Sequence, residues 1–140
     1  MPSRDKIERQ KTDRCFGCGQ QNPGGLKLRF RAEDESVKAE FTPSPAHEGY
    51  PGYLHGGITC ALLDEAMGWA AYHLSSGALA ATGRLQIKFR RPLLIDEPLT
   101  VTASITRRST RHLWTEAIVK RKDGKVAAEA TAIMSISDGD

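Results

Sequence analysis

The segment that decides the fold reads GITCALLDEAMGWAAYH and occupies residues 57–73. Only two of its side chains are charged, Asp64 and Glu65, and few are β-branched. This length and composition favour a helix over a strand, because β-branched side chains are the ones that suit strands. Since apolar residues occur on most of its sides, we expect the helix to be largely buried. The Ser-Ser-Gly of residues 75–77 is expected to end it.

Alternating apolar and polar residues on both sides of this helix predict half-buried strands. The expected strands are residues 26–31, 36–41, 84–90, 99–106, 113–119 and 126–134. Residues 32–35 are expected to form a turn, and Asp123-Gly124 is typical of a hairpin turn. Short connections between the last four strands indicate an antiparallel sheet.

This order of elements predicts an α+β domain in which a curved antiparallel sheet of about six strands wraps around one long central helix. The 140 residues suffice for one domain. We divide the chain into a charged N-terminal arm (1–14), the domain (15–136) and a C-terminal tail (137–140). The open edges of such a sheet invite pairing with a second subunit.

The charge and the longest uncharged stretch limit the classes of partner. The net charge of +3 suits an anionic small ligand, and no Lys/Arg run is dense enough to indicate a nucleic-acid protein. The uncharged residues 66–83 include a histidine, serines and glycines, which are too polar to predict a membrane span. Residues 1–14 lack the apolar stretch of a signal peptide. With three cysteines and no export signal, we expect a cytoplasmic protein.

His55-Gly56-Gly57 lies where a loop rich in Gly and Pro meets the predicted helix. The first turn of a helix has backbone amides without intrahelical partners, and the helix dipole makes this end weakly positive. Such an end can hold a developing oxyanion, and glycines let a carbonyl approach the backbone. The alternative is that Gly-Gly is merely a turn before a helix.

Asp64 shares one stripe of the predicted helix with small residues. The stripe consists of Gly57, Ala61, Asp64 and Gly68. A carboxylate within an apolar helix is costly unless it is hydrogen-bonded, so a functional acid is favoured over one that merely pairs with an arginine. Glu65 lies about 100° around the helix from it, so only one of the two acids can easily share the stripe.

An acid and an oxyanion site are sufficient for thioester hydrolysis. The leaving thiol has a pKa of about 8.5, so it departs without strong protonation. The acid can attack the carbonyl itself or activate a water molecule, and the sequence leaves both open.

Residues 55–68 resemble the signature of hot-dog thioesterases of the PaaI-like, 4-hydroxybenzoyl-CoA thioesterase superfamily. The CFGCG, NP and GL motifs of residues 15–26, and EGYPG at 48–52, are similar to one branch of it. The resemblance covers residues 15–136 and implies the hot-dog fold, an acyl-CoA thioesterase activity and no metal or redox cofactor.

The resemblance assigns roles to individual residues of the proposed site. Asp64 is expected to be the nucleophile or general base, and the amide of Gly56, with Gly57, to polarise the thioester carbonyl. His55 is expected to order the loop, and Thr82 to supply a hydroxyl beside the acid or the water. Some relatives have an asparagine six residues before the histidine, where this chain has Gly49.

The resemblance also implies that the active site lies across the interface of a homodimer, and dimers of this family commonly pair into tetramers. The basic residues best placed for the phosphates of CoA are Lys88, Arg90, Arg107, Arg108 and Arg111, of which the Arg107–Arg111 turn is preferred. A solvated strand face explains all of these basic residues equally well.

Structural roles are expected for three other side chains of the predicted helix. Trp69 and Tyr72 are expected in the core or an interface, and His73 is expected to stabilise the C-terminal end of the helix dipole.

The Cys15-x-x-Cys18 pair is similar to half a zinc ribbon or a redox pair. Because a structural zinc needs two more ligands, we expect two unligated thiols and no metal.

Three other functions are alternatives to hydrolysis. A hot-dog dehydratase would pair a histidine with a carboxylate, as His55 with Asp64 or Glu65 could, but the Gly-Gly and acid spacing favours hydrolysis. A non-catalytic acyl-CoA-binding module would bind CoA without releasing thiol. Binding to nucleic acid would require steep salt dependence.

Overall fold

The computed structural model describes residues 13–75 and 79–137. Its elements are β1 (Arg31–Glu33), β2 (Ser36–Phe41), the 3-10 turn η1 (Pro45–His47), α2 (Gly56–Leu74), β3 (Leu79–Phe89), β4 (Leu99–Arg108), β5 (His112–Lys120) and β6 (Val126–Ser137). Most of the predicted arm (1–14) and tail (137–140) lies outside the described residues, as do two of the three predicted helix-ending residues, at 76 and 77.

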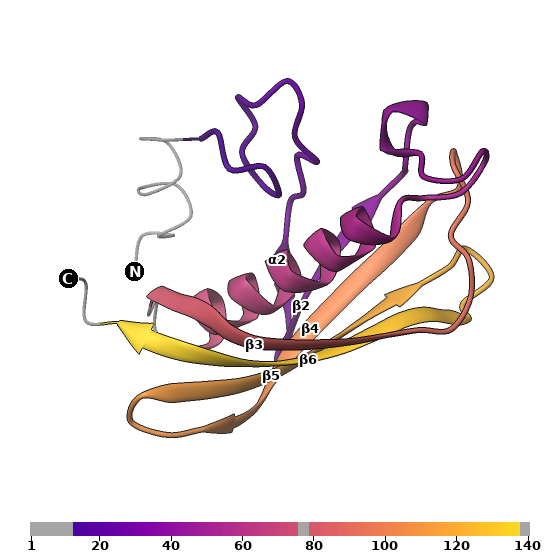
Figure 1. The fold of residues 1–140 in the computed structure, drawn as a ribbon. Helices are drawn as coiled ribbons and strands as arrows, with labels where there is room; N and C mark the ends of the chain where they lie inside the picture. Colours follow the sequence, from indigo (N-terminus) through magenta and orange to yellow (C-terminus); the bar gives the residue numbers. More distant parts are fainter. Residues whose placement is uncertain (1–12, 76–78, 138–140) are drawn as a thin grey trace.

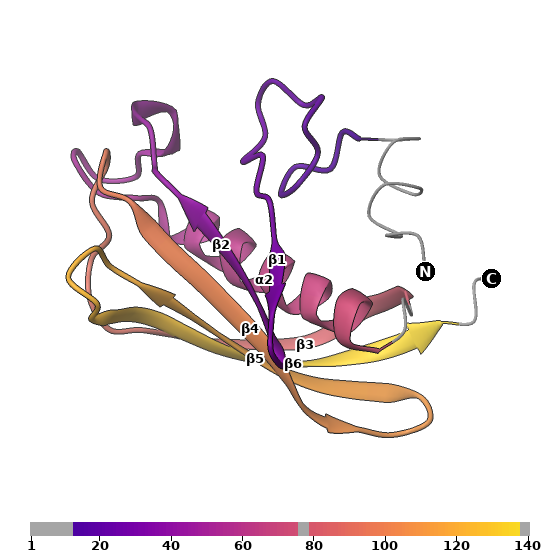
Figure 2. The ribbon, with the colours of Figure 1, turned by 180° about the vertical axis from the view of Figure 1, so that it is seen from behind.

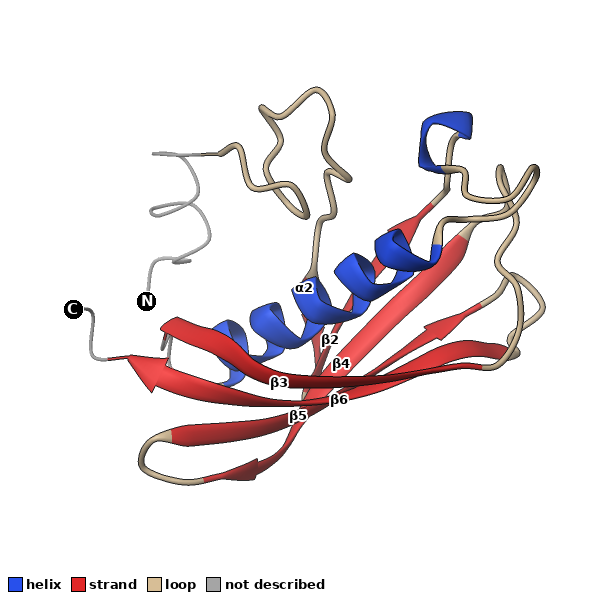
Figure 3. Ribbon diagram, viewed as in Figure 1, coloured by secondary structure: helices blue, strands red, loops and turns tan. Residues whose placement is uncertain are grey.

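The strands form one antiparallel sheet in the order β1-β2-β4-β5-β6-β3. The sheet curves around α2, which lies along one of its faces (Figure 1). Figure 3 shows the same single layer of strands beneath the long helix. The predicted α+β arrangement of six strands around one central helix is therefore confirmed for the described residues.

The core fills the space between α2 and the sheet. Leu62, Leu63 and Met67 of the helix are fully buried, together with Val101 of β4 and Val119 of β5. Each such side chain contributes about 1.5–3 kcal/mol by leaving water. The predicted burial of the helix is confirmed.

The first predicted strand is wrong for most of its length, because β1 begins only at Arg31. Leu26 and Leu28 are buried, as their alternation indicated, but Lys27 between them has a φ of 53°, which an extended strand excludes. The amides of the two leucines instead donate to the carbonyl oxygens of Phe16 and Gly17. The alternation of apolar residues here therefore comes from a loop that buries one of its sides, and not from a strand.

This N-terminal loop, residues 13–30, lies over α2 on the side away from the sheet. Figure 2, seen from behind, shows the same placement as Figure 1. The helix is thus covered by the sheet on one side and, over part of its length, by the loop on the other.

β3 starts earlier than the sequence indicated and contains an irregularity that matters for the site. The strand begins at Leu79 rather than residue 84, and its register against β6 shifts between Thr82 and Arg84. Thr82 lies opposite Met134 and Leu85 lies opposite Ala132, both of which are buried. The extra residue therefore puts Thr82 and Leu85 on the same, helix-facing side of the sheet.

β3 is also an edge strand, since only β6 pairs with it in the described part of the chain. Large apolar side chains on it remain exposed, with Leu85 at 38% and Phe89 at 57%. No helix within the described residues is long and apolar enough to cross a membrane.

Candidate active site

Asp64 lies in the middle of α2 with its side chain half-buried. The hydroxyl of Thr82, on β3, donates a hydrogen bond of 2.6 Å to Oδ1 of Asp64. The pairing of acid and hydroxyl expected from the resemblance is therefore present. A charge-assisted hydrogen bond of this length fixes the orientation of the carboxylate.

A cavity of about 220 Å³ opens beside this pair. Its lining includes Asp64, Glu65, Gly68, Trp69, Tyr72 and Thr82. A Cβ added at Gly68 would meet no atom within 4 Å, so the helix stripe next to the acid is open. Trp69 and Tyr72 are largely buried and pack edge to face, with ring centroids 5.9 Å apart. Predicted as core or interface residues, they also form one wall of the cavity.

The helix begins at Gly56, and His55 is its N-cap. Nδ1 of His55 accepts a hydrogen bond of 2.9 Å from the amide of Gly57. This nitrogen therefore carries no proton in this arrangement, and a neutral ring has its hydrogen on Nε2. The imidazole orders the start of the helix.

The two amides of the predicted oxyanion site are not equivalent. The amide of Gly57 is engaged by His55, whereas no hydrogen bond within the described residues engages the amide of Gly56. A second cavity of about 320 Å³ adjoins Gly56 and is lined also by Leu54, Thr59 and Phe89. The amide of Gly56 is therefore the better placed of the two for a ligand oxygen.

Gly49 packs directly against the motif histidine. A Cβ at this position would lie 3.0 Å from Cα of His55, and the Gly49 amide donates to the carbonyl oxygen of Tyr53. Where some relatives have an asparagine side chain, this chain places backbone against the histidine.

Asp64 and Gly56 do not meet within one chain. Eight residues of the same helix separate them, which corresponds to about 12 Å along its axis. A single thioester carbonyl spans far less, so it could not contact both groups of one copy of the chain. His55 is farther still from either carboxylate of the helix, which gives no support to a histidine–acid pair within one subunit.

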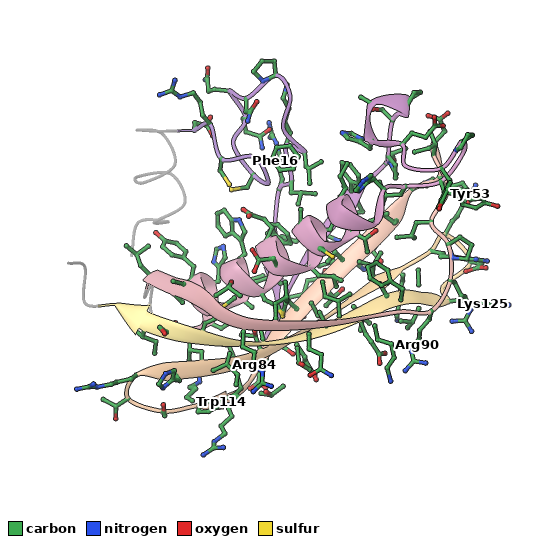
Figure 4. The ribbon with its side chains drawn as sticks, viewed as in Figure 1. Phe16, Tyr53, Arg84, Arg90, Trp114 and Lys125 are labelled. Carbon is green, nitrogen blue, oxygen red and sulfur yellow. The ribbon has the colours of Figure 1, made fainter. Side chains whose placement is uncertain are left out.

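The basic residues predicted for CoA lie in two groups. Lys88 lines a shallow groove on the sheet face away from α2, next to Glu116 and Glu129. Arg90 forms a 2.8 Å ion pair with Glu129, which raises the pKa of the guanidinium. Figure 4 shows Arg84 and Trp114 on the sheet. This strand face is therefore partly neutralised by its own acids.

The Arg107–Arg111 turn lies at the other end of α2 from Gly56. Arg108 donates to the carbonyl oxygen of Leu74, the last residue of the helix, and Arg107 stacks over Trp114 at 4.4 Å. No ion pair within the described residues engages the cations of this turn.

The structure brings Glu65 to the cysteine pair, a contact that the sequence did not indicate. The thiol of Cys15 donates to Oε1 of Glu65 at 3.4 Å, and Cys18 is buried beside them. Fifty residues separate the thiol from the carboxylate, so no local pattern could have paired them. Cys60, the third cysteine of the chain, is outside this group, and burial raises the pKa of its thiol.

Comparisons with known proteins agree with this architecture. A family model described as the thioesterase superfamily matches residues 51–128, more than half of the chain. The acyl-coenzyme A thioesterase THEM4 of Xenopus laevis is 27% identical over 94 residues, which cover 66% of this chain and 41% of that protein. This chain thus spans about two fifths of the length of that relative.

Two solved structures show the same fold. The thioesterase superfamily protein RHA08564 superposes with a TM-score of 0.81 at 26% identity, covering 88% of this chain and 60% of that one. The PaaI protein of E. coli superposes with a TM-score of 0.75 at 20% identity, covering 81% and 82%. The expected hot-dog fold is confirmed, and the matched family model shows that this chain belongs to the thioesterase superfamily.

Proposed function

We propose that this chain hydrolyses acyl-CoA thioesters to a free acid and CoA, with Asp64 as the nucleophile or general base. The observation that carries the proposal is the 2.6 Å hydrogen bond from Thr82 to Asp64 at the wall of a cavity. The name of the relative from Xenopus laevis, an acyl-coenzyme A thioesterase, supports the substrate class.

Two routes use the same groups. As a general base, Asp64 takes a proton from water while the hydroxide adds to the thioester carbonyl, and the C–S bond then breaks to release the thiolate of CoA. As a nucleophile, Asp64 displaces the thiolate and forms an anhydride that water cleaves. In both routes the amide of Gly56 donates to the carbonyl oxygen as it becomes negative.

The distance between Asp64 and Gly56 in one chain leads us to include a second copy in the proposed site. A homodimer through the β3 edge would cover the exposed side chains of Leu85 and Phe89 and extend the sheet. The helix stripe with Asp64 adjoins this edge through Thr82. Acid and helix end would then come from different subunits, and pairing of dimers into tetramers remains part of the proposal.

The phosphates of CoA are assigned to the Arg107–Arg111 turn rather than to the strand face. Arg90 already pairs with Glu129, and Lys88 lies next to the same carboxylate. A cation with an acidic neighbour gains less from a phosphate than one without, because the neighbour already screens its charge.

The test is a thiol-release assay on short, medium, long and aromatic acyl-CoAs. Asp64→Asn is expected to lower kcat by about 100- to 10,000-fold, since it removes the reacting group, with unchanged circular dichroism. Asp34→Asn is the matched control, because this residue of the β1–β2 turn has a φ of 53° that asparagine tolerates. Unchanged turnover in folded Asp64→Asn would overturn the assignment.

A further inference from the structure

The turn that contains Cys15 and Cys18 places two thiols and one carboxylate in a single cluster on α2. The two Sγ atoms and a carboxylate oxygen of Glu65 all lie within 4.8 Å of one another. We propose that Cys15, Cys18 and Glu65 form a binding site for a thiophilic divalent cation of the Zn²⁺ type. The proposed metal site is chemically independent of the proposed hydrolysis, since none of its three ligands has a role in that reaction.

The distance from the Cys15 thiol to the Glu65 carboxylate is close to that expected for two ligands of one tetrahedral ion. With Zn–S near 2.3 Å and Zn–O near 2.1 Å, two ligands of one tetrahedral ion lie about 3.6 Å apart. The observed distance from Sγ of Cys15 to Oε1 of Glu65 is 3.4 Å. An ion would replace the proton that the Cys15 thiol now donates to the carboxylate.

Backbone contacts hold the two thiols in this arrangement. The amide of Gly19 donates to the carbonyl oxygen of Cys15 at 2.8 Å and closes the turn. A Cβ at Gly19 would lie 2.3 Å from the backbone nitrogen of Cys15, so a side chain at this position would open the turn. The amides of Leu26 and Leu28 bind the same turn at Phe16 and Gly17. The C-x-x-C spacing is that of the metal-binding half of zinc sites.

Gly17 brings the turn into direct contact with the third ligand. A Cβ there would lie 2.5 Å from Cδ and 2.6 Å from Oε2 of Glu65. The absence of a side chain at residue 17 is therefore what lets the carboxylate reach the thiols. Glu65 points away from its neighbour Asp64, which is left to hydrogen-bond with Thr82.

Glu65 supplies one of the two further ligands that a zinc ion needs beside the cysteines, and within the described residues the fourth tetrahedral position is left to water. Cys15 lines the same cavity as Asp64, so water can reach the ion from there. The ion would fasten the loop of residues 13–30 to the middle of α2 and so stabilise one wall of that cavity. Metal binding to the folded chain adds stability that grows with the logarithm of the ratio of metal concentration to its dissociation constant.

The experiment uses the full-length, untagged protein purified under reducing conditions. Zinc content is measured by mass spectrometry, and cobalt titration reports thiolate ligation through its charge-transfer band in the near ultraviolet. We expect one zinc per chain and a cobalt spectrum of two thiolates. Cys15→Ser and Cys18→Ser should each lose stoichiometric metal, whereas Cys60→Ser, the matched control, should keep it.

Gly17→Ala is the sharper variant because it keeps all three ligands. Its new methyl group must displace the Glu65 carboxylate, the flexible end of a side chain. Metal affinity should fall by at least about tenfold, the lower limit for loss of a supporting group at a metal site. Glu65→Gln should behave alike, and unchanged affinity in both variants would overturn the assignment of Glu65.

A measurement on the unmodified protein covers the case in which the cysteine variants do not fold. Bound zinc should protect the half-buried thiol of Cys15, but not that of Cys60, from alkylation, and a chelator should remove that protection. Any of three results would overturn the proposal. The protein could stay free of metal at micromolar zinc, the Cys15→Ser/Cys18→Ser variant could retain the metal, or Cys15 and Cys18 could form a disulfide that excludes zinc. Asp64→Asn should lose hydrolysis and keep its zinc, which separates this inference from the proposed reaction.

Discussion

Thr82 and Asp64 are eighteen residues apart in the chain, yet the hydroxyl of one donates to Oδ1 of the other at 2.6 Å. The contact depends on the register shift between Thr82 and Arg84, which turns the threonine toward α2. The acid is therefore oriented by the sheet rather than by its own helix. A substrate in the adjoining cavity would meet a carboxylate with one oxygen already occupied.

We expect Thr82→Val to lower kcat by about 10- to 100-fold, the effect of losing a hydrogen bond of about 1.5–3 kcal/mol to a charged group. KM should change little, because Thr82 positions the acid and is not proposed to hold CoA. Thr82→Ser keeps a hydroxyl and should retain most of the activity. Steady-state thiol release separates kcat from KM, and equal activity of the valine and serine variants would contradict the role.

His55→Ala should destabilise the protein by about 0.5–2 kcal/mol, since the first turn of α2 loses its N-cap acceptor. His55→Asn should restore most of this stability, because asparagine is a good N-cap. Urea denaturation of all variants at one protein concentration measures both, because apparent stability changes with concentration when subunits associate. A stable His55→Ala protein would show that the hydrogen bond to Gly57 contributes nothing.

Leu85→Glu should convert the proposed dimer to monomers and abolish hydrolysis, because it places a charge at the centre of the β3 edge. Leu94→Glu is the matched control, since both leucines are 38% exposed and Leu94 lies outside β3. Light scattering after size exclusion gives the mass of each variant. Full activity of a monomeric wild-type protein would rule out a site shared between subunits.

Arg111→Ala and Arg107→Ala should raise KM for acyl-CoA substrates severalfold and leave kcat nearly unchanged, because each removes a cation proposed to bind phosphate. Arg121→Ala serves as the control, as this guanidinium is already paired with Asp123. For each variant, KM is measured for acyl-CoA and for a short thioester that lacks the nucleotide, and the two changes in KM are compared. An equal rise for both substrates would contradict phosphate recognition.

The β5–β6 turn gives the chain a pH-dependent contribution to stability. The hydrogen bond from Arg121, followed by that from the Lys125 amide, lowers the pKa of Asp123 to about 2. A lowered folded-state pKa stabilises the protein above the unfolded value of about 4 and loses this contribution as the pH falls from there toward 2.

Asp123→Asn tests this contribution, since Asn-Gly keeps the hairpin turn. The variant should be less stable than the wild type at neutral pH, and the difference should shrink as the pH falls from about 4 toward 2. Urea midpoints across this range measure it. A difference that widens in acid would show that the ionised carboxylate does not stabilise the turn.

The sequence by itself determined the central helix, five of the six strands and the residues at the start of the helix. These features follow from local causes, namely the scarcity of charge over residues 57–73, the period-two alternation and the glycines after His55. The same alternation predicted a strand over residues 26–31 and was wrong for most of it, because a loop that packs one side on a core also buries alternate residues.

Only the tertiary structure decided how the chemical groups combine. Leu85 faces the helix, so in a regular strand Thr82, three residues before it, would face away from the helix. The register shift between Thr82 and Arg84 turns the Thr82 side chain to the helix-facing side instead. Asp64 contacts Thr82 of β3, whereas its neighbour Glu65 contacts Cys15 of the loop that folds over α2. Such contacts join residues 18 and 50 positions apart, so they depend on packing between elements, which no local pattern encodes.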